Sequence, residues 1–307
     1  MHTRPTVPPA AVKLAGSELL SWRRRQLQHG GRAGDLDWLL EMAAGLRWPE
    51  LQGLRLHPEQ AVTLSASLQD LERIWNRHRQ DQEPLQYLVG LCPWRDLVID
   101  VAPGVLIPRQ ETELLVELAL EVGSEELSSG DHDDGPGLWA DLGTGSGCLA
   151  MALARAWPQS RGLAVDLSRD ALIQARANLR RLQLQQRVEV IEGSWWEPLH
   201  RFRGHLDLVV SNPPYIPTAT WKELEPIVLR HEPELALHAG EDGLAAIRAI
   251  AAEAGQQLAP GGWLLLEHHH DQSAAVLQLL ETAGLERVTA RRDLEGHERF
   301  ALARRPR

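Results

Sequence analysis

Short apolar runs alternate with helical patterns from Leu138 to the end of the chain, and no other feature restricts the fold as much. Seven of these runs are candidate strands, covering residues 138–142, 162–166, 188–191, 206–210, 263–267, 287–290 and 299–302. Helical patterns such as residues 169–182 and 243–258 separate most of them. Strands that alternate with helices form a mostly parallel sheet with helices on both faces, and ligands bind beyond the carboxyl ends of its strands. The sequence therefore predicts an α/β fold with a binding site at that edge.

The first 108 residues are organised differently. Residues 16–85 carry apolar side chains at helical spacing without strand-like alternation, which predicts a small all-helical N-terminal domain. The β-like runs 97–101 and 104–107, split by Ala102-Pro103, predict a β-hairpin in a linker over residues 86–108. We expect residues 1–15 to form a loose tail and residues 109–307 to form the α/β domain.

Charge and cysteine content argue against several classes of function. A formal net charge of -10 argues against sequence-independent binding to a phosphate backbone, so we expect no direct contact with nucleic acid. The two cysteines, Cys92 and Cys148, form no CxxC pair, so neither a disulfide framework nor a thiolate zinc site is indicated. The first 15 residues lack a long apolar segment and resemble neither a signal peptide nor a membrane span. These features favour a cytoplasmic protein without a membrane partner.

The stretch Ser211-Asn212-Pro213-Pro214-Tyr215 follows the candidate strand 206–210. Two prolines cannot continue a strand ladder, so the strand must stop at Asn212 and leave as a stiff loop. A planar –NH2 group could donate one hydrogen to the Asn212 side chain and one to the Pro213 carbonyl, with the flat face of Tyr215 against it. The alternative interpretation is a simple strand-ending turn, since Asn-Pro is a common turn dipeptide.

A glycine loop, Gly143-Thr144-Gly145-Ser146-Gly147, follows the strand that ends at Asp141-Leu142. Its spacing does not match the G-x-G-x-x-G fingerprint of dinucleotide sites, and no Walker lysine follows. The loop suits a ligand with an amino-acid end and an adenosine end but no phosphates. A tight strand-to-helix turn without a ligand is the alternative.

Two further positions fit such a ligand. Asp166 ends the next strand, where a carboxylate can accept both ribose hydroxyls, although an acid there can also cap a helix. Trp195 or Trp196 follows the third strand, where an adenine ring would lie. Plain core packing is the alternative for these indoles.

Together, the glycine loop, Asp166 and Asn212-Pro213-Pro214-Tyr215 resemble those of class I S-adenosylmethionine-dependent methyltransferases that methylate amino groups. The Asn-Pro-Pro-Tyr motif alone is shared with DNA adenine-N6, rRNA and protein methyltransferases. More of the chain is similar to one family, the peptide chain release factor glutamine methyltransferases (HemK/PrmC family). The similar segments lie between about residues 84 and 304, and they are residues 84–90, 106–113, 141–148, 211–216, 232–233, 235–237, 240, 242–243 and 262–268.

The resemblance implies a Rossmann-like class I methyltransferase fold, with a seven-stranded mixed sheet and an N-terminal domain that docks the substrate. It implies methyl transfer from S-adenosyl-L-methionine to the side-chain amide N5 of the glutamine in the Gly-Gly-Gln loop of release factors, leaving S-adenosyl-L-homocysteine. The implied catalytic residues are Asn212, Pro213 and Tyr215, and the implied substrate-binding residues are Asn212, Pro213, Pro214 and Tyr215. The implied cofactor-binding residues are Gly143, Thr144, Gly145, Ser146, Gly147, Asp166, Trp195 and Asn212.

Departures from the family pattern also occur. Ser194 stands where an Asp is common, and His269-His270 stand where a glycine and other polar residues are expected. Neighbouring residues of His268-His269-His270 would point to opposite faces of an extended strand, so we expect no metal site. The alternatives to glutamine methylation are transfer to an exocyclic base amine, as in adenine-N6 methylation, and a catalytically silent cofactor-binding adaptor. We expect a monomer.

Overall fold

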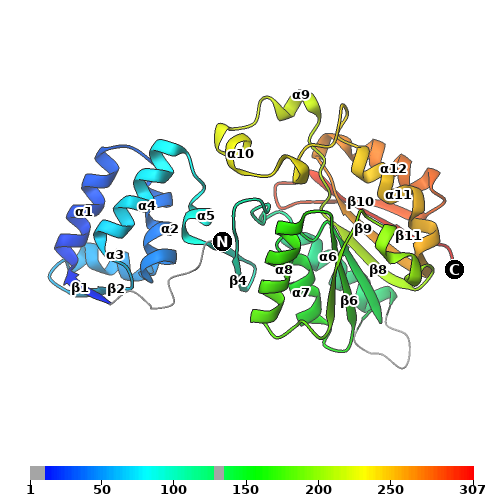
Figure 1. The fold of residues 1–307 in the computed structure, drawn as a ribbon, viewed down its shortest axis with the longest axis horizontal. Helices are drawn as coiled ribbons and strands as arrows, with labels where there is room; N and C mark the ends of the chain where they lie inside the picture. The colour runs from blue at the N-terminus through cyan, green and yellow to red at the C-terminus, as the bar shows by residue number, and fades with distance from the viewer. Residues whose placement is uncertain (1–10, 128–134) are drawn as a thin grey trace. The chain divides into compact units, whose positions relative to one another are not determined.

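The computed structural model describes residues 11–127 and 135–307. The chain divides into two compact units, Met1–Leu91 and Cys92–Arg307. Figure 1 shows their helices and strands, coloured from blue at the N-terminus to red at the C-terminus. The division falls inside the segment predicted to be a linker, residues 86–108.

The N-terminal unit is helical, as predicted. Its helices are α1 (Gly16–Gln28), α2 (Ala33–Ala44), α3 (Trp48–Leu56), α4 (Leu68–Asp81) and α5 (Leu85–Val89). Ser67 caps α4 by accepting a hydrogen bond from the backbone N–H of Asp70, and Gly45 ends α2 in the left-handed conformation. The apolar faces of the helices bury a core that includes Trp22, Leu39 and Trp75.

The prediction of an all-helical unit is wrong in one detail. Strand β1 (Val12–Ala15), placed in the loose tail from the sequence, pairs antiparallel with β2 (Ala61–Leu64). Leu14 and Leu64 are the buried residues of this ribbon. Each strand has only four residues with one buried side chain, so its alternation is too short to recognise in a sequence. The rest of the predicted tail, residues 1–10, lies outside the described residues.

The predicted hairpin exists, but only one of its two predicted strands, residues 97–101, takes part in it. Strand β3 (Leu91–Trp94) pairs with β4 (Leu97–Asp100), whereas residues 104–107 form no strand. Pro93 misled the prediction, because proline is disfavoured in strands and is tolerated at the edge of a small ribbon such as this one. The segment after β4 instead runs as a loop whose Val105 and Ile107 side chains are buried.

The C-terminal unit contains the predicted seven-stranded mixed sheet, in the order β10-β11-β9-β8-β5-β6-β7. Strands β5 to β9 run parallel to one another, and β11 and β10 complete the sheet antiparallel at one end. The strands are β5 (Leu138–Leu142), β6 (Arg161–Asp166), β7 (Val188–Glu192), β8 (Leu206–Ser211), β9 (Leu258–Glu267), β10 (Glu286–Arg292) and β11 (Glu298–Arg304). The strand order reverses between β5 and β8, which is the place where such sheets bind ligands.

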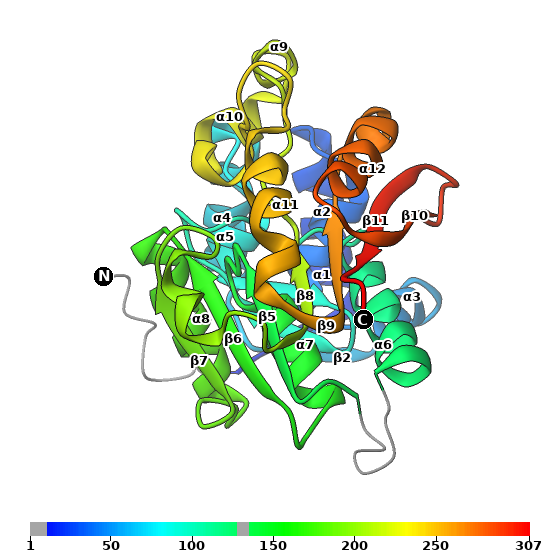
Figure 2. The same ribbon diagram turned by 90° about the vertical axis from the view of Figure 1, so that its right-hand side faces the viewer.

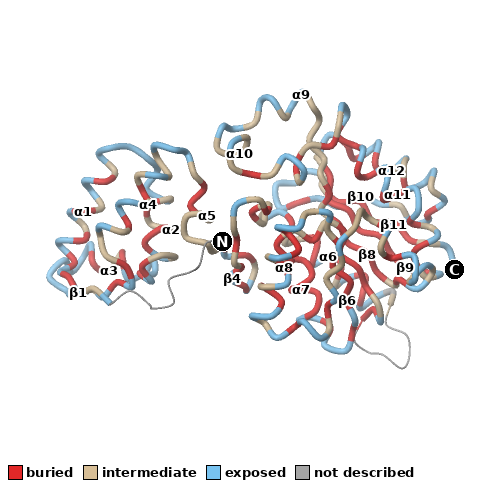
Figure 3. The backbone as a smooth tube through the Cα atoms, in the orientation of Figure 1, coloured by how far each residue is buried: buried red, intermediate tan, exposed pale blue. Residues whose placement is uncertain are grey.

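Helices cover both faces of this sheet, as Figure 2 shows. Helices α6 (Glu113–Glu126), α7 (Cys148–Ala156) and α8 (Arg169–Arg181) are neighbours on one face, and α11 (Ala245–Gln257) and α12 (Ser273–Thr282) are neighbours on the other. Most residues of the central strands β5, β6 and β8 are buried, as the red segments of Figure 3 show. The predicted fold class is therefore confirmed.

A long excursion between β8 and β9 carries short elements that stand apart from the sheet in Figure 1. They are α9 (Thr218–Trp221), α10 (Pro226–His231) and the 3-10 turn η2 (Glu234–Ala236). Two further 3-10 turns, η1 (Glu197–Phe202) and η3 (His270–Gln272), follow β7 and β9. No helix in the two described segments is long and apolar enough to cross a membrane.

Candidate active site

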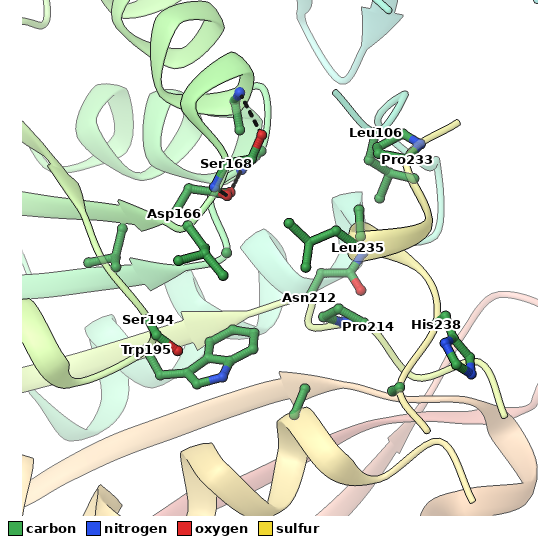
Figure 4. Close-up of a pocket in the computed structure, with 18 of the residues that line it drawn as sticks. Leu106, Asp166, Ser168, Ser194, Trp195, Asn212, Pro214, Pro233, Leu235 and His238 are labelled. Atoms are coloured by element: carbon green, nitrogen blue, oxygen red, sulfur yellow. Dashed lines mark hydrogen bonds between the residues drawn. The ribbon is translucent and has the colours of Figure 1, made fainter. Parts of the chain in front are cut away.

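A cavity of about 410 Å³ lies at the carboxyl ends of β5, β6, β7 and β8. Figure 4 shows Asp166 and Trp195 on one side of it and Asn212, Pro214 and Leu235 on the other. The motifs predicted from the sequence therefore meet at the switch in strand order. The volume is within the usual range for small-molecule sites.

The glycine loop has the form expected from its sequence. The backbone N–H groups of Gly143 and Thr144 both donate to the carbonyl of Val165, at 2.9 Å, which fixes the loop against β6. Gly145 has a φ of +55° and faces open space, because a Cβ atom added there would meet nothing within 4 Å. Gly143 and Gly145 line the cavity, whereas Thr144 and Ser146 are buried beneath it. The loop therefore presents bare backbone to a ligand.

A hydrogen bond to Asp141 fixes the Thr144 side chain. The Thr144 hydroxyl donates to Asp141 Oδ2 at 2.6 Å, and both side chains are buried. Burial raises the pKa of Asp141 to about 7. Gly147, with a φ of +83°, begins α7, where an added Cβ would come within 3.2 Å of Ala175 Cβ. Asp141, Thr144 and Gly147 therefore shape the loop without lining the cavity.

Asp166 lies at the end of β6 and lines the cavity. Its Oδ2 accepts from the Gly145 N–H and its Oδ1 from the Ser168 N–H, each at 2.8 Å. Burial raises the pKa of this carboxyl. The cap of α8 is Ser168, so the alternative that Asp166 is itself the helix cap does not hold. Each carboxylate oxygen keeps a second lone pair for a ligand hydroxyl.

The two adjacent tryptophans have different places. Trp195 lines the cavity beside Gly143, with a φ of +46° that a bulky side chain rarely adopts. Trp196 is 1% exposed and its Nε1–H donates to the Ile250 carbonyl at 2.9 Å, as a core residue does. The structure thus separates two residues that the sequence left as alternatives, and Ser194 also lines the cavity.

The Asn-Pro-Pro-Tyr corner begins where β8 ends. Asn212 and Pro214 line the cavity, but Pro213 is buried and Tyr215 turns its hydroxyl toward Glu267 Oε1, at 3.2 Å. Burial raises the pKa of Tyr215, and the Glu267 carboxylate raises it further. The corner is tied to the excursion, because the Ile216 N–H donates to the Leu237 carbonyl and the Ala239 N–H donates to the Ile216 carbonyl, each at 2.9 Å.

Two residues to which the sequence analysis gave no role, Thr112 and Glu267, complete this corner. Asn212 Nδ2 donates to Thr112 Oγ1 at 2.8 Å, and Thr112 Oγ1 donates to Glu267 Oε2 at 2.7 Å. Both residues are at least 98% buried. Both lie in segments similar to the methyltransferase family, and this similarity was the only signal that could have indicated them.

A buried glutamate joins two walls of the cavity. Glu232 Oε1 accepts from Arg109 Nη2 at 2.7 Å, and its Oε2 accepts from the Ile107 N–H at 3.3 Å. This links the wall at Gly104–Leu106 to the wall that begins at Pro233. The site is thus closed by segments that precede α6 and follow β8.

The residues that line this cavity fit a nucleoside that carries no phosphate. Among its lining residues, all within the described part of the chain, none is Lys or Arg. A carboxylate, an indole face and bare glycine backbone are present instead. Across residues 11–127 and 135–307, no group of three His, Cys, Asp or Glu side chains is placed to hold a metal ion. His268 is buried and its Nδ1 lies 2.8 Å from the His269 carbonyl oxygen.

Comparison with known proteins agrees with this geometry. The family model described as "Methyltransferase small domain" matches residues 120–224. A release factor glutamine methyltransferase of Prochlorococcus marinus is 48% identical over 95% of this chain and 98% of its own length. Relatives with the same name in Synechocystis sp. and Thermosynechococcus vestitus are 38% and 44% identical, over 95% and 89% of this chain and 97% and 91% of their own lengths.

A mixed seven-stranded sheet, with a glycine loop and an Asn-Pro-Pro-Tyr corner at its switch point, defines a methyltransferase of the Rossmann-like class I type. The identity extends over nearly the whole chain at 38% to 48%. The chain belongs to the release factor glutamine methyltransferase family.

Proposed function

We propose that this enzyme transfers the methyl group of S-adenosyl-L-methionine to the side-chain amide N5 of the glutamine in the Gly-Gly-Gln loop of peptide chain release factors. The observation that supports it most is the orientation of Asn212. Its Nδ2 group is bound to Thr112, which leaves Oδ1, at the edge of the cavity, to accept a hydrogen from an incoming –NH2 group. The names of the relatives identify the acceptor as glutamine.

The cofactor fits the residues of the larger side of the cavity. Asp166 would accept the ribose hydroxyls, Trp195 would lie against the adenine, and the backbone at Gly143 and Gly145 would accommodate the amino-acid end. When bound, S-adenosyl-L-methionine supplies an electrophilic methyl group on a sulfonium centre. The acceptor nitrogen would gain its N–CH3 bond as the S–CH3 bond breaks, which leaves S-adenosyl-L-homocysteine, and its surplus proton would leave to solvent after the transfer.

The chain's task in catalysis is to orient a weak nucleophile. The lone pair of an amide nitrogen is delocalised, so the nitrogen attacks only when it is held in line and allowed to become pyramidal. Asn212 Oδ1 and the Pro213 carbonyl would each accept one of the two N–H groups, which turns the lone pair toward the methyl donor. Fixed acceptors of this kind lower a barrier by several kcal/mol. Packing of Tyr215 on the acceptor amide remains a prediction.

We also infer the setting of the reaction. The helical N-terminal domain, predicted over residues 16–85, would dock the release factor, and residues 109–307 would carry the transfer. We expect the reaction to take place in the cytoplasm. A monomer is expected, and light scattering of the purified protein would test it.

A transfer assay tests the proposal. The full chain is incubated with radiolabelled S-adenosyl-L-methionine and one of three acceptors: a release factor, adenine-containing DNA, or RNA. We expect label on the release factor alone, and none on a release factor whose loop glutamine is replaced by alanine. Label on nucleic acid, or on the glutamine-free release factor, would refute the proposal. A complete lack of transfer would favour a silent adaptor.

A further inference from the structure

We propose that Thr112 is a positioning residue that sets the orientation of the Asn212 amide, and that Glu267 acts through it. This inference deepens the proposed function and rests on it for the acceptor. The three side chains come from different elements: Thr112 precedes α6, Asn212 follows β8, and Glu267 is the last residue of β9.

The direction of the hydrogen bonds follows from the chemistry of the groups. Above its pKa of about 7 the Glu267 carboxyl is ionised and only accepts, and a threonine hydroxyl has a single hydrogen. Since Thr112 Oγ1 lies 2.7 Å from Glu267 Oε2, its hydrogen is donated there. The Thr112 oxygen must therefore accept in its 2.8 Å contact with Asn212. Only the –NH2 end of the Asn212 amide can satisfy that contact, which leaves Oδ1 as the end available to a substrate.

A reversed Asn212 amide is disfavoured by the same contact. It would place Asn212 Oδ1 against the lone pairs of Thr112 Oγ1, and it would offer the substrate –NH2 a second donor instead of an acceptor. Thr112 and Glu267 are 2% and 1% exposed, so water cannot repair the mismatch. Thr112 and Glu267 therefore hold the Asn212 amide in one of two orientations that have nearly the same shape.

Glu267 is itself held from its other side. Its Oε1 accepts from the Tyr215 hydroxyl at 3.2 Å, so a second residue of the corner fixes the carboxylate. Strands β8 and β9 are neighbours, with Ser211 opposite Leu266, which places the end of β9 beside the corner. The network therefore joins both polar members of the Asn-Pro-Pro-Tyr motif through one buried carboxylate.

The Thr112 side chain takes no part in capping α6. The Thr112 backbone angles are helical, with φ -62° and ψ -19°, and its side chain makes no capping hydrogen bond. The hydroxyl oxygen is bonded to Asn212 and Glu267 instead.

Replacement of Thr112 tests this arrangement in the full chain at pH 8, where Glu267 is ionised, with a release factor as acceptor. Thr112→Val keeps the shape and loses the hydroxyl, whereas Thr112→Ser keeps the hydroxyl and loses the methyl group. We expect Thr112→Val to lower kcat about 10- to 100-fold, with the Kd for S-adenosyl-L-methionine within about threefold of the wild-type value. Thr112→Ser is expected to retain at least roughly a third of the wild-type kcat.

A second readout does not depend on the acceptor. In wild-type protein the Nδ2 protons of Asn212 should be protected from exchange with water, as measured by NMR. Thr112→Val should lose this protection and Thr112→Ser should keep it. Unchanged protection or unchanged kcat in Thr112→Val would overturn the inference, and so would equal losses in both variants. Failure of the proposed function is distinct, because it appears as absent transfer by the wild-type enzyme.

Discussion

The Ser211 hydroxyl donates to the Leu142 carbonyl at 2.6 Å, and this bond joins the carboxyl ends of β8 and β5. Leu142 immediately precedes the glycine loop, and Ser211 immediately precedes the Asn-Pro-Pro-Tyr corner. The strand order reverses between these two strands. The bond therefore fixes the distance between the part of the site that would hold the methyl donor and the part that would hold the acceptor.

Ser211→Ala should destabilise the protein. Ser211 is fully buried, so the variant loses a hydrogen bond in a site that water does not reach. We expect a loss of roughly 1–3 kcal/mol in the free energy of unfolding. Urea titration of the variant and the wild type measures it. Ser21→Ala is the matched control, because the Ser21 hydroxyl bonds the Ser17 carbonyl on an exposed helix face. A control loss as large as the Ser211 loss would contradict the account.

Replacement of Trp195 should affect cofactor binding, whereas replacement of Trp196 should affect the stability of the fold. Trp195→Ala removes a cavity wall and should weaken S-adenosyl-L-methionine binding about tenfold or more, with little change in stability. Trp196→Ala empties part of the core and should cost about 3–5 kcal/mol of unfolding free energy. Calorimetric binding and urea unfolding measure the two effects. The reverse pattern would show that the wrong indole has been assigned to the cofactor.

Gly243→Ala should disturb the Asn-Pro-Pro-Tyr corner through a clash with its backbone. Gly243 has a φ of +72°, and an added Cβ would come within 2.3 Å of the Tyr215 carbonyl oxygen. We expect a loss of about 2 kcal/mol or more in stability, together with a fall in kcat. Gly34→Ala is the control, since Gly34 lies in α2 with nothing within 4 Å of its added Cβ. The control should be neutral or stabilising by up to about 1 kcal/mol. Equal effects would refute the steric argument.

Glu267→Gln should change how stability depends on pH. Burial raises the pKa of Glu267 to about 7, the Glu111 charge raises it slightly, and Thr112, Tyr215 and Arg299 oppose the shift. Because the folded-state pKa is above the unfolded one, the stability that Glu267 contributes is present at low pH. It is lost as the pH rises from about 4.5 to about 7.

Glutamine cannot ionise, so the variant lacks this loss. Between pH 5 and pH 8 the wild type should lose on the order of 2 kcal/mol more stability than Glu267→Gln. Asp141 also titrates near pH 7, but both proteins contain it and its effect cancels in the comparison. Urea unfolding of both proteins at pH 5 and pH 8 measures this difference in stability. Parallel pH profiles for the two proteins would show that Glu267 is not held as described.

The fold was predictable because it depends on local patterns. Strands β5, β6 and β8 are buried apolar runs, and such runs are recognisable when helical patterns separate them. The short ribbon at Val12–Ala15 has no such pattern, and Pro93 concealed the first strand of the hairpin. Each of these ribbon strands has only four residues, so its pairing partner decides its structure more than its own sequence does.

The site was predictable in its parts and not in its connections. Asn212 and Asp166 follow strands whose ends must meet, so their proximity could be inferred from topology. The Thr112 hydroxyl is 100 residues from Asn212 and 155 from Glu267 in sequence. Nothing in the local pattern indicates such contacts. Likewise, Trp195 and Trp196 are adjacent residues of the same type, and only the folded backbone decides which of them faces the cavity.

Mass spectrometry of a release factor tests the central claim most directly. The release factor is incubated with S-adenosyl-L-methionine and either wild-type enzyme or Asn212→Ala, and its Gly-Gly-Gln loop peptide is then sequenced. We expect one added methyl group on the loop glutamine with the wild type and none with Asn212→Ala, whose cofactor Kd should stay within about threefold of the wild-type value. An unmodified glutamine after wild-type treatment, or equal methylation by Asn212→Ala, would contradict the account.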